Sequence, residues 1–154
     1  MLGRTYEREN CSAARALEIV GERWSLLIIR NAMFAGETRF TEFQRHLGIA
    51  PNILSNRLDR FVEAGLMHTR SLTGDRETRE YVLTSKGLDL QPVILALTEW
   101  GDRWAAPEGP PIIYRHDGCG GRVRTHLRCD DCGIALAPTQ VTQRPGPGAH
   151  RGDR

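Results

Sequence analysis

The feature that most constrains this chain is an amphipathic segment, Pro51–Ala64, preceded by a short turn. If the segment is a helix, an apolar stripe runs along it at the spacing i, i+4, i+7, i+8, formed by Leu54, Leu58, Phe61 and Val62. Its polar side chains fall away from the stripe or on its flanks: Asn52, Ser55, Asn56, Asp59, Arg57 and Arg60. Such a face suits a helix that reads base edges in a DNA groove, although a merely solvated face has the same pattern.

A second short helix is predicted immediately before this segment. Thr41 can cap a helix that runs through Leu47, after an extended piece at 39–40. The Gly-Ile-Ala sequence at 48–50 forms the turn, and Pro51 occupies the first turn of the next helix, where proline is tolerated. Two short helices joined by such a glycine-containing turn form a helix-turn-helix.

A β-hairpin is predicted directly after the helix-turn-helix. Residues 66–70 have the pattern of a strand, 73–78 of a polar turn and 79–83 of the returning strand. A hairpin in this position is a wing. Arginines at its tip and base can contact phosphates or enter a minor groove: Arg70, Arg76 and Arg79. This arrangement favours DNA binding over a solvated hairpin without a ligand.

Two helices are predicted before this unit and a longer one after it. Apolar spacing predicts helices over 11–20 and 22–35. Beyond a cap at 84–87, apolar residues recur to the end of a long helix: Leu90, Val93, Ile94, Leu97, Trp100 and Trp104. A second copy of the chain would bury the two tryptophans, or they could pack on the first two helices of the same chain. We favour pairing with a second copy.

Composition sets limits without identifying a function. A chain of 154 residues with 40% hydrophobic residues suits one domain with appendages. It has no membrane-spanning apolar run and no apolar N-terminal signal region, so we expect a cytoplasmic protein without membrane association. Net charge is +2, and arginine supplies nearly all the positive charge. Arginine suits phosphate and guanine contacts, but a GC-rich genome produces the same bias. Without a catalytic acid–base pair or activated nucleophile, we expect no enzyme.

Three of the four cysteines follow a helix-breaking Pro-Glu-Gly-Pro-Pro segment at 107–111. After an expected short strand at 112–114, two pentads have the form ligand-x-x-Cys-Gly, the spacing of a metal knuckle. One structural Zn²⁺ would account for all four ligand positions, His116, Cys119, Cys129 and Cys132. His126 could replace His116 as the fourth ligand. The alternative is a metal-free hairpin with reduced thiols or with a Cys129–Cys132 redox pair.

Several blocks, in order along the chain, resemble HxlR-type bacterial transcriptional regulators. They are C-S-A-A-R-A-L at 11–17, G-E-R-W-S-L-L-I-I-R at 21–30, R-F-T-E-F at 39–43, I-L-S-N-R-L at 53–58, E-A-G-L at 63–66, Y-V-L-T-S-K-G at 81–87 and E-W-G at 99–101. The resemblance implies a winged helix-turn-helix related to the MarR type, homodimerisation through the terminal helices, and a two-fold-symmetric DNA operator. It also implies that the DNA-facing positions are Arg39, Asn52, Ser55, Asn56, Arg57 and the wing arginines.

Cys11 matches a position that serves as a redox or electrophile sensor in some members of that family. A helix N-terminus lowers the pKa of a thiol and makes it more reactive. A lone cysteine is, however, most often a small buried apolar residue. The sensing role of Cys11 is therefore a secondary hypothesis, with a small molecule or electrophile as the effector.

Together these patterns predict an α+β chain, mainly α. It comprises a winged helix-turn-helix domain over 1–106 with a long C-terminal dimerisation helix, a small zinc-ribbon-like appendage over 107–142, and a disordered tail over 143–154. The chain is predicted to be a homodimeric, sequence-specific regulator of transcription, and we expect it to act as a repressor. The predicted DNA contacts are Arg39, Asn52, Ser55, Asn56, Arg57, Arg60, Arg70, Arg76 and Arg79. The rival hypotheses are a thiol- or zinc-dependent sensor with DNA binding as its output, and an adaptor that binds protein.

Overall fold

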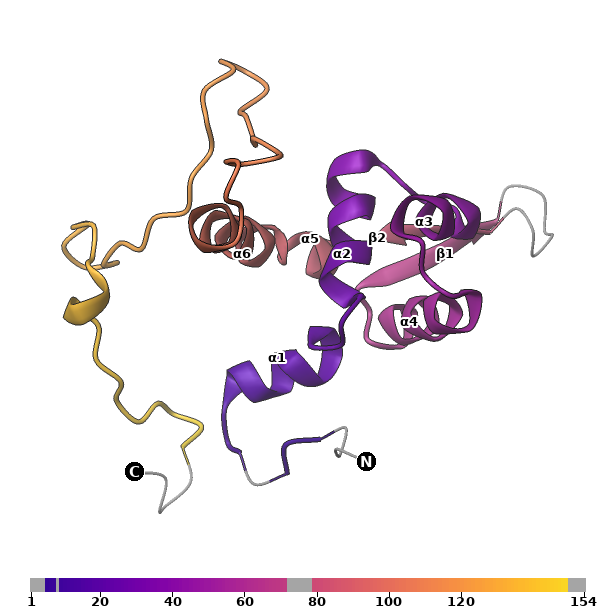
Figure 1. Ribbon diagram of the computed structural model, residues 1–154. Helices are drawn as coiled ribbons and strands as arrows, with labels where there is room; N and C mark the ends of the chain where they lie inside the picture. The colour runs from indigo at the N-terminus through magenta and orange to yellow at the C-terminus, as the bar shows by residue number, and fades with distance from the viewer. Residues whose placement is uncertain (1–4, 8, 72–78, 150–154) are drawn as a thin grey trace. The chain divides into compact units, whose positions relative to one another are not determined.

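The computed structural model describes residues 5–7, 9–71 and 79–149 (Figure 1). The chain divides into two compact units, Met1–Gln91 and Pro92–Arg154. The first unit contains most of the helices and a two-stranded sheet, and the second contains the last long helix and the C-terminal appendage. The predicted first domain, 1–106, thus extends beyond the first unit by one helix.

Two helices begin the first unit, as the apolar spacing predicted. Helix α1 is Ser12–Val20, and α2 is Ser25–Arg30, which continues as a π-helical turn, η1, over Asn31–Ala35. The second helix begins later than residue 22 because the Ser25 N–H closes a turn on the carbonyl of Glu22 at 2.9 Å. The same segment still ends before Gly36, as expected.

The helix-turn-helix forms where the sequence predicted it. Helix α3 covers Phe40–Leu47 and α4 covers Pro51–Glu63, with Pro51 at the first helical position. The expected cap at Thr41 is wrong by two residues: the cap is Arg39, whose backbone is extended (φ −100°, ψ 145°). The reason is Glu42, whose carboxylate accepts the N–H groups of Thr38 and Arg39, both at 3.0 Å.

The wing consists of β1, Met67–Ser71, paired antiparallel with β2, Arg79–Leu83. The returning strand has its predicted bounds. The first strand starts one residue late because the Leu66 N–H still bonds to the carbonyl of Phe61 at the end of α4. Arg39 forms an isolated bridge with Glu80, which joins the start of α3 to the sheet. The predicted loop at 73–78, with Arg76, lies outside the described residues.

The core of the first unit is formed by fully buried side chains from α2, α3, α4 and β1. They are Ile28, Ile29, Phe43, Leu54, Leu58, Phe61 and Met67. Three of the four residues in the predicted α4 stripe are among them, and Val62 is half-buried. Burying each such side chain contributes about 1.5–3 kcal/mol, so the inner face of α4 fixes which side chains its outer face exposes.

The helix predicted after the wing is in fact two helices. Helix α5 is Ser85–Leu88, capped by Thr84, and α6 is Gln91–Trp104. Pro92 accounts for the break because it has no N–H to donate to the carbonyl of Leu88, although proline is tolerated in the first turn of α6. Within the described ranges, every helix is too short or too polar to cross a membrane.

The appendage is an irregular chain attached to α6. Thr125 donates its N–H and hydroxyl to the Glu99 carboxylate at 2.8 and 2.5 Å, and Arg122 lies 4.0 Å from Asp102. The strand expected at 112–114 is absent from this described segment, which instead contains two turns closed by isolated bridges. A short 3₁₀ helix, η3, follows at Pro138–Gln140. These bonds explain why α6 groups with the appendage.

Candidate nucleic-acid interface

The outer face of α4 carries the short polar side chains assigned to DNA from the sequence. Asn52, Ser55 and Asn56 are exposed, and Asp59 continues the row. Residues three and four apart are neighbours on a helix, so these groups form one surface. Amides and hydroxyls both donate and accept hydrogen bonds, which is what base edges in the major groove require. The helix can therefore make contacts that depend on DNA sequence.

The two arginines of α4 instead contact α1 and the segment that follows it. Arg57 Nη2 lies 2.8 Å from Glu22 Oε2, and its side chain is 14% exposed. Arg60 Nη1 lies 4.0 Å from Glu22, and Arg60 Nη2 donates to the Glu18 carbonyl at 3.5 Å. Any DNA contact by either arginine therefore competes with these bonds.

At the base of the wing, one carboxylate orients two outward-facing arginines. Glu80 accepts from Arg70 Nη2 at 2.6 Å and Nε at 3.0 Å, and Arg39 Nε lies 4.0 Å away. The hydrogen bond from Arg70 is the main cause that lowers the pKa of Glu80. Glu80 is buried, whereas the Arg70 and Arg39 side chains are 58% and 55% exposed. The guanidiniums are thus fixed and still available to phosphates.

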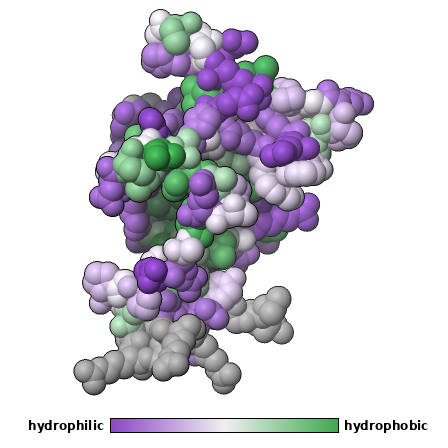
Figure 2. Space-filling view, turned by 90° about the vertical axis from the view of Figure 1, so that its left-hand side faces the viewer, coloured by the Kyte–Doolittle hydropathy of each residue, from purple (hydrophilic) through white to green (hydrophobic). Residues whose placement is uncertain are grey.

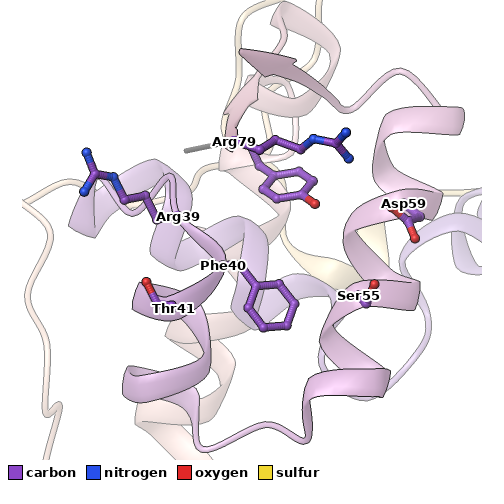
Figure 3. A pocket seen from close by; sticks show the side chains of 7 residues that line it. Arg39, Phe40, Thr41, Ser55, Asp59 and Arg79 are labelled. Atoms are coloured by element: carbon purple, nitrogen blue, oxygen red, sulfur yellow. The ribbon is translucent and has the colours of Figure 1, made fainter. Parts of the chain in front are cut away.

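A concavity of about 680 Å³ lies among α3, α4 and β2. Its lining residues are Arg39, Phe40, Thr41, Ser55, Asp59, Arg79 and Tyr81. In Figure 3, Arg79 reaches from β2 toward the helix that carries Ser55 and Asp59, whereas Arg39 points away from the cavity. The concavity thus places Arg79 of the wing beside the polar face of α4, as a single nucleic-acid surface requires.

The carboxylates that hold these arginines were not predicted from the sequence. Glu42 stands three residues after the cap, a capping-box position, and the backbone N–H groups of Arg39 and then Thr38 lower its pKa. Glu80 lies directly opposite Arg70 in the strand register, so the correct pairing would have revealed it. Glu22 has no such local signal, because its partner Arg57 is far along the chain.

Cys11 is exposed and is the N-cap residue of α1, with extended backbone (φ −137°, ψ 128°). The alternative that it is a buried apolar residue does not hold for the single chain. A reagent in solution can reach its sulfur.

Helix α6 exposes a row of large apolar side chains at the spacing 4, 3, 4. The exposed fractions are 48% for Val93, 53% for Leu97, 62% for Trp100 and 67% for Trp104. Apolar side chains, in green, reach the surface among polar ones in Figure 2. Soluble monomers rarely expose a contiguous row of this kind, which is typical of a protein-binding surface.

The four predicted zinc ligands form two separate pairs. His116 Nδ1 lies 3.2 Å from Cys119 Sγ. In the second pair, the backbone N–H groups of Cys132 and Asp131 lower the pKa of the Cys129 thiol. No group of three or more histidine, cysteine or acidic side chains is positioned for a metal ion in the part of the chain that is described.

Comparison with known sequences gives matches along most of the chain. The model of the HxlR-like helix-turn-helix family matches residues 19–109. An HTH-type transcriptional regulator of Mycobacterium tuberculosis, Rv3095, is 47% identical over 141 residues, which cover 91% of this chain and 89% of that protein. Residues 1–106 cannot supply an alignment of that length, so the similarity continues into the appendage.

Two solved structures match different shares of the chain. PA1607, described as a candidate transcription factor, has a TM-score of 0.80 at 36% identity and covers 92% of this chain and 99% of its own. The redox regulator HypR, in its reduced form, has a TM-score of 0.55 at 28% identity, covering 60% of this chain and 92% of its own. Because 92% of HypR is used in covering 60% of this chain, HypR has no counterpart of comparable length to the appendage. These relatives are described as regulators of transcription or redox regulators, in agreement with the prediction that the chain is no enzyme.

Proposed function

Because this chain belongs to the HxlR-like helix-turn-helix family, we propose that it regulates transcription by binding double-stranded DNA as a homodimer, and that it acts as a repressor. The observation that carries the proposal is the exposed row of Asn52, Ser55 and Asn56 on α4, beside arginines fixed at the wing base. The row supplies hydrogen bonds to base edges, and the arginines supply charge for phosphates.

In this proposal α4 lies in the major groove and the wing lies against the DNA backbone. Arg39, Arg70 and Arg79 contact phosphates, with Arg76 assigned the same role from its place in the sequence. The logarithm of the binding constant falls linearly with the logarithm of salt concentration. Each neutralised phosphate makes this slope steeper by about 0.9. Arg57 and Arg60 hold α4 against Glu22 and contribute to DNA binding through that positioning.

The homodimer is proposed from the apolar row on α6. A second copy would bury Leu97, Trp100 and Trp104 by a self-complementary contact, which generates two-fold symmetry. Two reading helices in such a dimer must lie about 34–36 Å apart to enter successive major grooves on one face of the duplex. The operator would accordingly be a two-fold repeat with half-sites one helical turn apart.

The test uses the promoter next to the chain's own gene, labelled for fluorescence anisotropy and for footprinting. We expect saturable binding, two protected half-sites, and reduced transcription from that promoter in a purified transcription reaction. Equal affinity for promoter and random DNA would contradict sequence-specific regulation. Absence of binding to any duplex would favour the rival function of a protein-binding adaptor.

A second candidate function is thiol sensing, with DNA binding as the output. It is favoured by the exposure of Cys11 at the start of α1 and by the likeness to the redox regulator HypR. Diamide or peroxide treatment should then release the promoter from the unmodified chain and leave the Cys11→Ser variant bound. Release from both proteins, or from neither, would exclude sensing through Cys11.

A further inference from the structure

The appendage contains a repeat of about thirteen residues that unites its two pentads. Arg115, His116, Cys119 and Gly120 recur in the same order and spacing as Arg128, Cys129, Cys132 and Gly133. The repeated positions therefore include an arginine before each pair of donors and a glycine after it.

The backbone of the two copies forms the same turn. In the first, Gly120 N–H donates to the carbonyl of His116 at 2.7 Å; in the second, Gly133 N–H donates to that of Cys129 at 2.9 Å. The two glycines adopt φ of +69° and +68°, the left-handed conformation that other residues adopt only with strain. The isolated bridges Arg115–Arg122 and Arg128–Ala135 close both turns at equivalent positions.

The repeated arginines stabilise the turns in the same manner. Arg115 Nη1 donates to the carbonyl of Gly120 at 2.8 Å, and Arg128 Nε donates to the carbonyl of Gly133 at 3.0 Å. Both side chains therefore bond to the end of their own turn. Two segments without an apolar core thus adopt one defined geometry from local bonds alone.

Each turn brings two metal-binding atoms together. His116 Nδ1 and Cys119 Sγ are 3.2 Å apart, whereas ligands on a tetrahedral zinc ion with bonds of about 2.0–2.1 and 2.3 Å are separated by about 3.6 Å. In the other turn, the Cys129 sulfur lies within hydrogen-bonding reach of the Cys132 side chain and of the backbone N–H groups of Cys132 and Asp131. The His116 ring lies against Gly118, where a Cβ would come within 2.9 Å of Cε1.

We propose that the two turns close on one structural Zn²⁺, bound by His116 Nδ1 and by the sulfurs of Cys119, Cys129 and Cys132. Each turn supplies half of a tetrahedral site, and the three thiols release their protons to solvent on binding. The repeat selects His116 over His126, because His116 occupies the position of Cys129 in the other copy. Closure would also shield Leu127 and Ile134, which are 67% and 61% exposed around the second turn.

The first test measures metal in the full chain, purified with a thiol reductant and without chelator. We expect about one zinc per chain by elemental analysis, and its release by a thiol-modifying mercurial. Zinc below about a tenth of an equivalent, after the chain has been offered excess Zn²⁺ and desalted, would overturn the proposal. A mass two hydrogens lower without reductant, in a chain that rejects zinc, would also overturn it, because two of the four thiols would then form a disulfide.

The second test replaces Zn²⁺ with Co²⁺, whose absorption reports geometry and thiolate count. Tetrahedral visible bands are expected, and Cys119→Ser and Cys132→Ser should each lose roughly a third of the near-ultraviolet thiolate band, since one of three thiolates is removed. His116→Gln should weaken Co²⁺ binding at least about tenfold. The matched variants His126→Gln and Cys11→Ser should bind Co²⁺ as the unmodified chain does. Equal losses in the two histidine variants, or octahedral spectra, would overturn the assignment, whatever the outcome of the DNA experiments.

Discussion

Two exposed helix faces of this chain differ in kind. Helix α4 exposes the neutral hydrogen-bonding side chains Asn52, Ser55 and Asn56, whereas α6 exposes Trp100 and Trp104. Small polar groups remain hydrated at little cost, but each square ångström of apolar surface left in water forgoes about 25 cal/mol. The α4 face is therefore stable without a ligand, and the α6 face favours a lasting partner. In the proposed function, the α4 face recognises DNA and the α6 face assembles the homodimer.

The largest effect is expected on the α6 face, from Trp100→Ala. A buried interface tryptophan contributes about 2 kcal/mol or more to association, so the dissociation constant of the homodimer should rise about 30-fold or more. Sedimentation velocity over a range of concentrations measures this shift directly.

The control for that substitution is Leu127→Ala, which removes an apolar side chain that is 67% exposed but lies outside α6. Its dimer should dissociate as the unmodified dimer does. Equal weakening by both substitutions would show that exposure alone, and not the row on α6, determines assembly, and the contrast between the two helix faces would be lost.

On the α4 face, Asn56→Ala should reduce affinity for the operator by about 1–3 kcal/mol while affinity for random DNA stays unchanged. The reason is that a side chain contacting a base edge contributes only where the base matches. Anisotropy titrations with both DNAs provide the measurement. Gln143→Ala, which removes an exposed amide far from α4 in sequence, is the matched control. An equal loss of affinity for both DNAs would mean that Asn56 contacts the DNA backbone and not a base edge.

A smaller effect should decide the role of Arg57, which pairs with Glu22 at 2.8 Å. If the pair only positions α4, Arg57→Ala and Glu22→Gln should lower the free energy of unfolding alike, by up to about 1 kcal/mol after allowance for partial exposure. If Arg57 leaves Glu22 to bind a guanine, only Arg57→Ala should cost operator affinity, by about 1–3 kcal/mol. Urea unfolding and operator titration of the two variants separate these outcomes.

The secondary structure through α6 was largely predictable because its signals are local. The apolar period of α4, Pro51 at its start and the glycine-containing turn before it specify the helix-turn-helix without distant information. The errors in helix bounds have causes that the apolar periodicity does not reveal. Pro92 divides a helix whose apolar spacing continues through the break, and Glu42 starts α3 before the predicted cap.

The candidate site was predicted less completely than the fold. The polar row on α4 follows from the opposite apolar stripe, so its exposure could be predicted. The ion pairs of Arg57 and Arg70 could not, because they depend on which helix packs beside α4 and on the register of the wing. A hairpin register depends on the type and length of its turn as well as on its strands. DNA contacts, dimerisation and zinc binding stay predictions.

The smallest effect concerns the protonation of Glu80. The hydrogen bond from Arg70 places the pKa of Glu80 below its ordinary value of 4.5. The unfolded chain therefore binds this proton more readily, so the stabilisation is complete above about pH 4.5 and is lost as the pH falls through the folded value. Unfolding free energy should fall more between pH 5 and about pH 3 in the unmodified chain than in Glu80→Gln.

The difference between the two proteins is the informative quantity, because Glu42 also has a lowered pKa and contributes the same sign in both. Urea titrations at each pH supply the measurement, and the two curves should approach one another in acid. Protonation of Glu80 also releases Arg70 and Arg39. These arginines keep their charge, but their contacts to phosphate should become less ordered. Parallel curves across the range would mean that Glu80 does not hold the wing arginines, and the wing base would then present two independent side chains rather than a fixed pair.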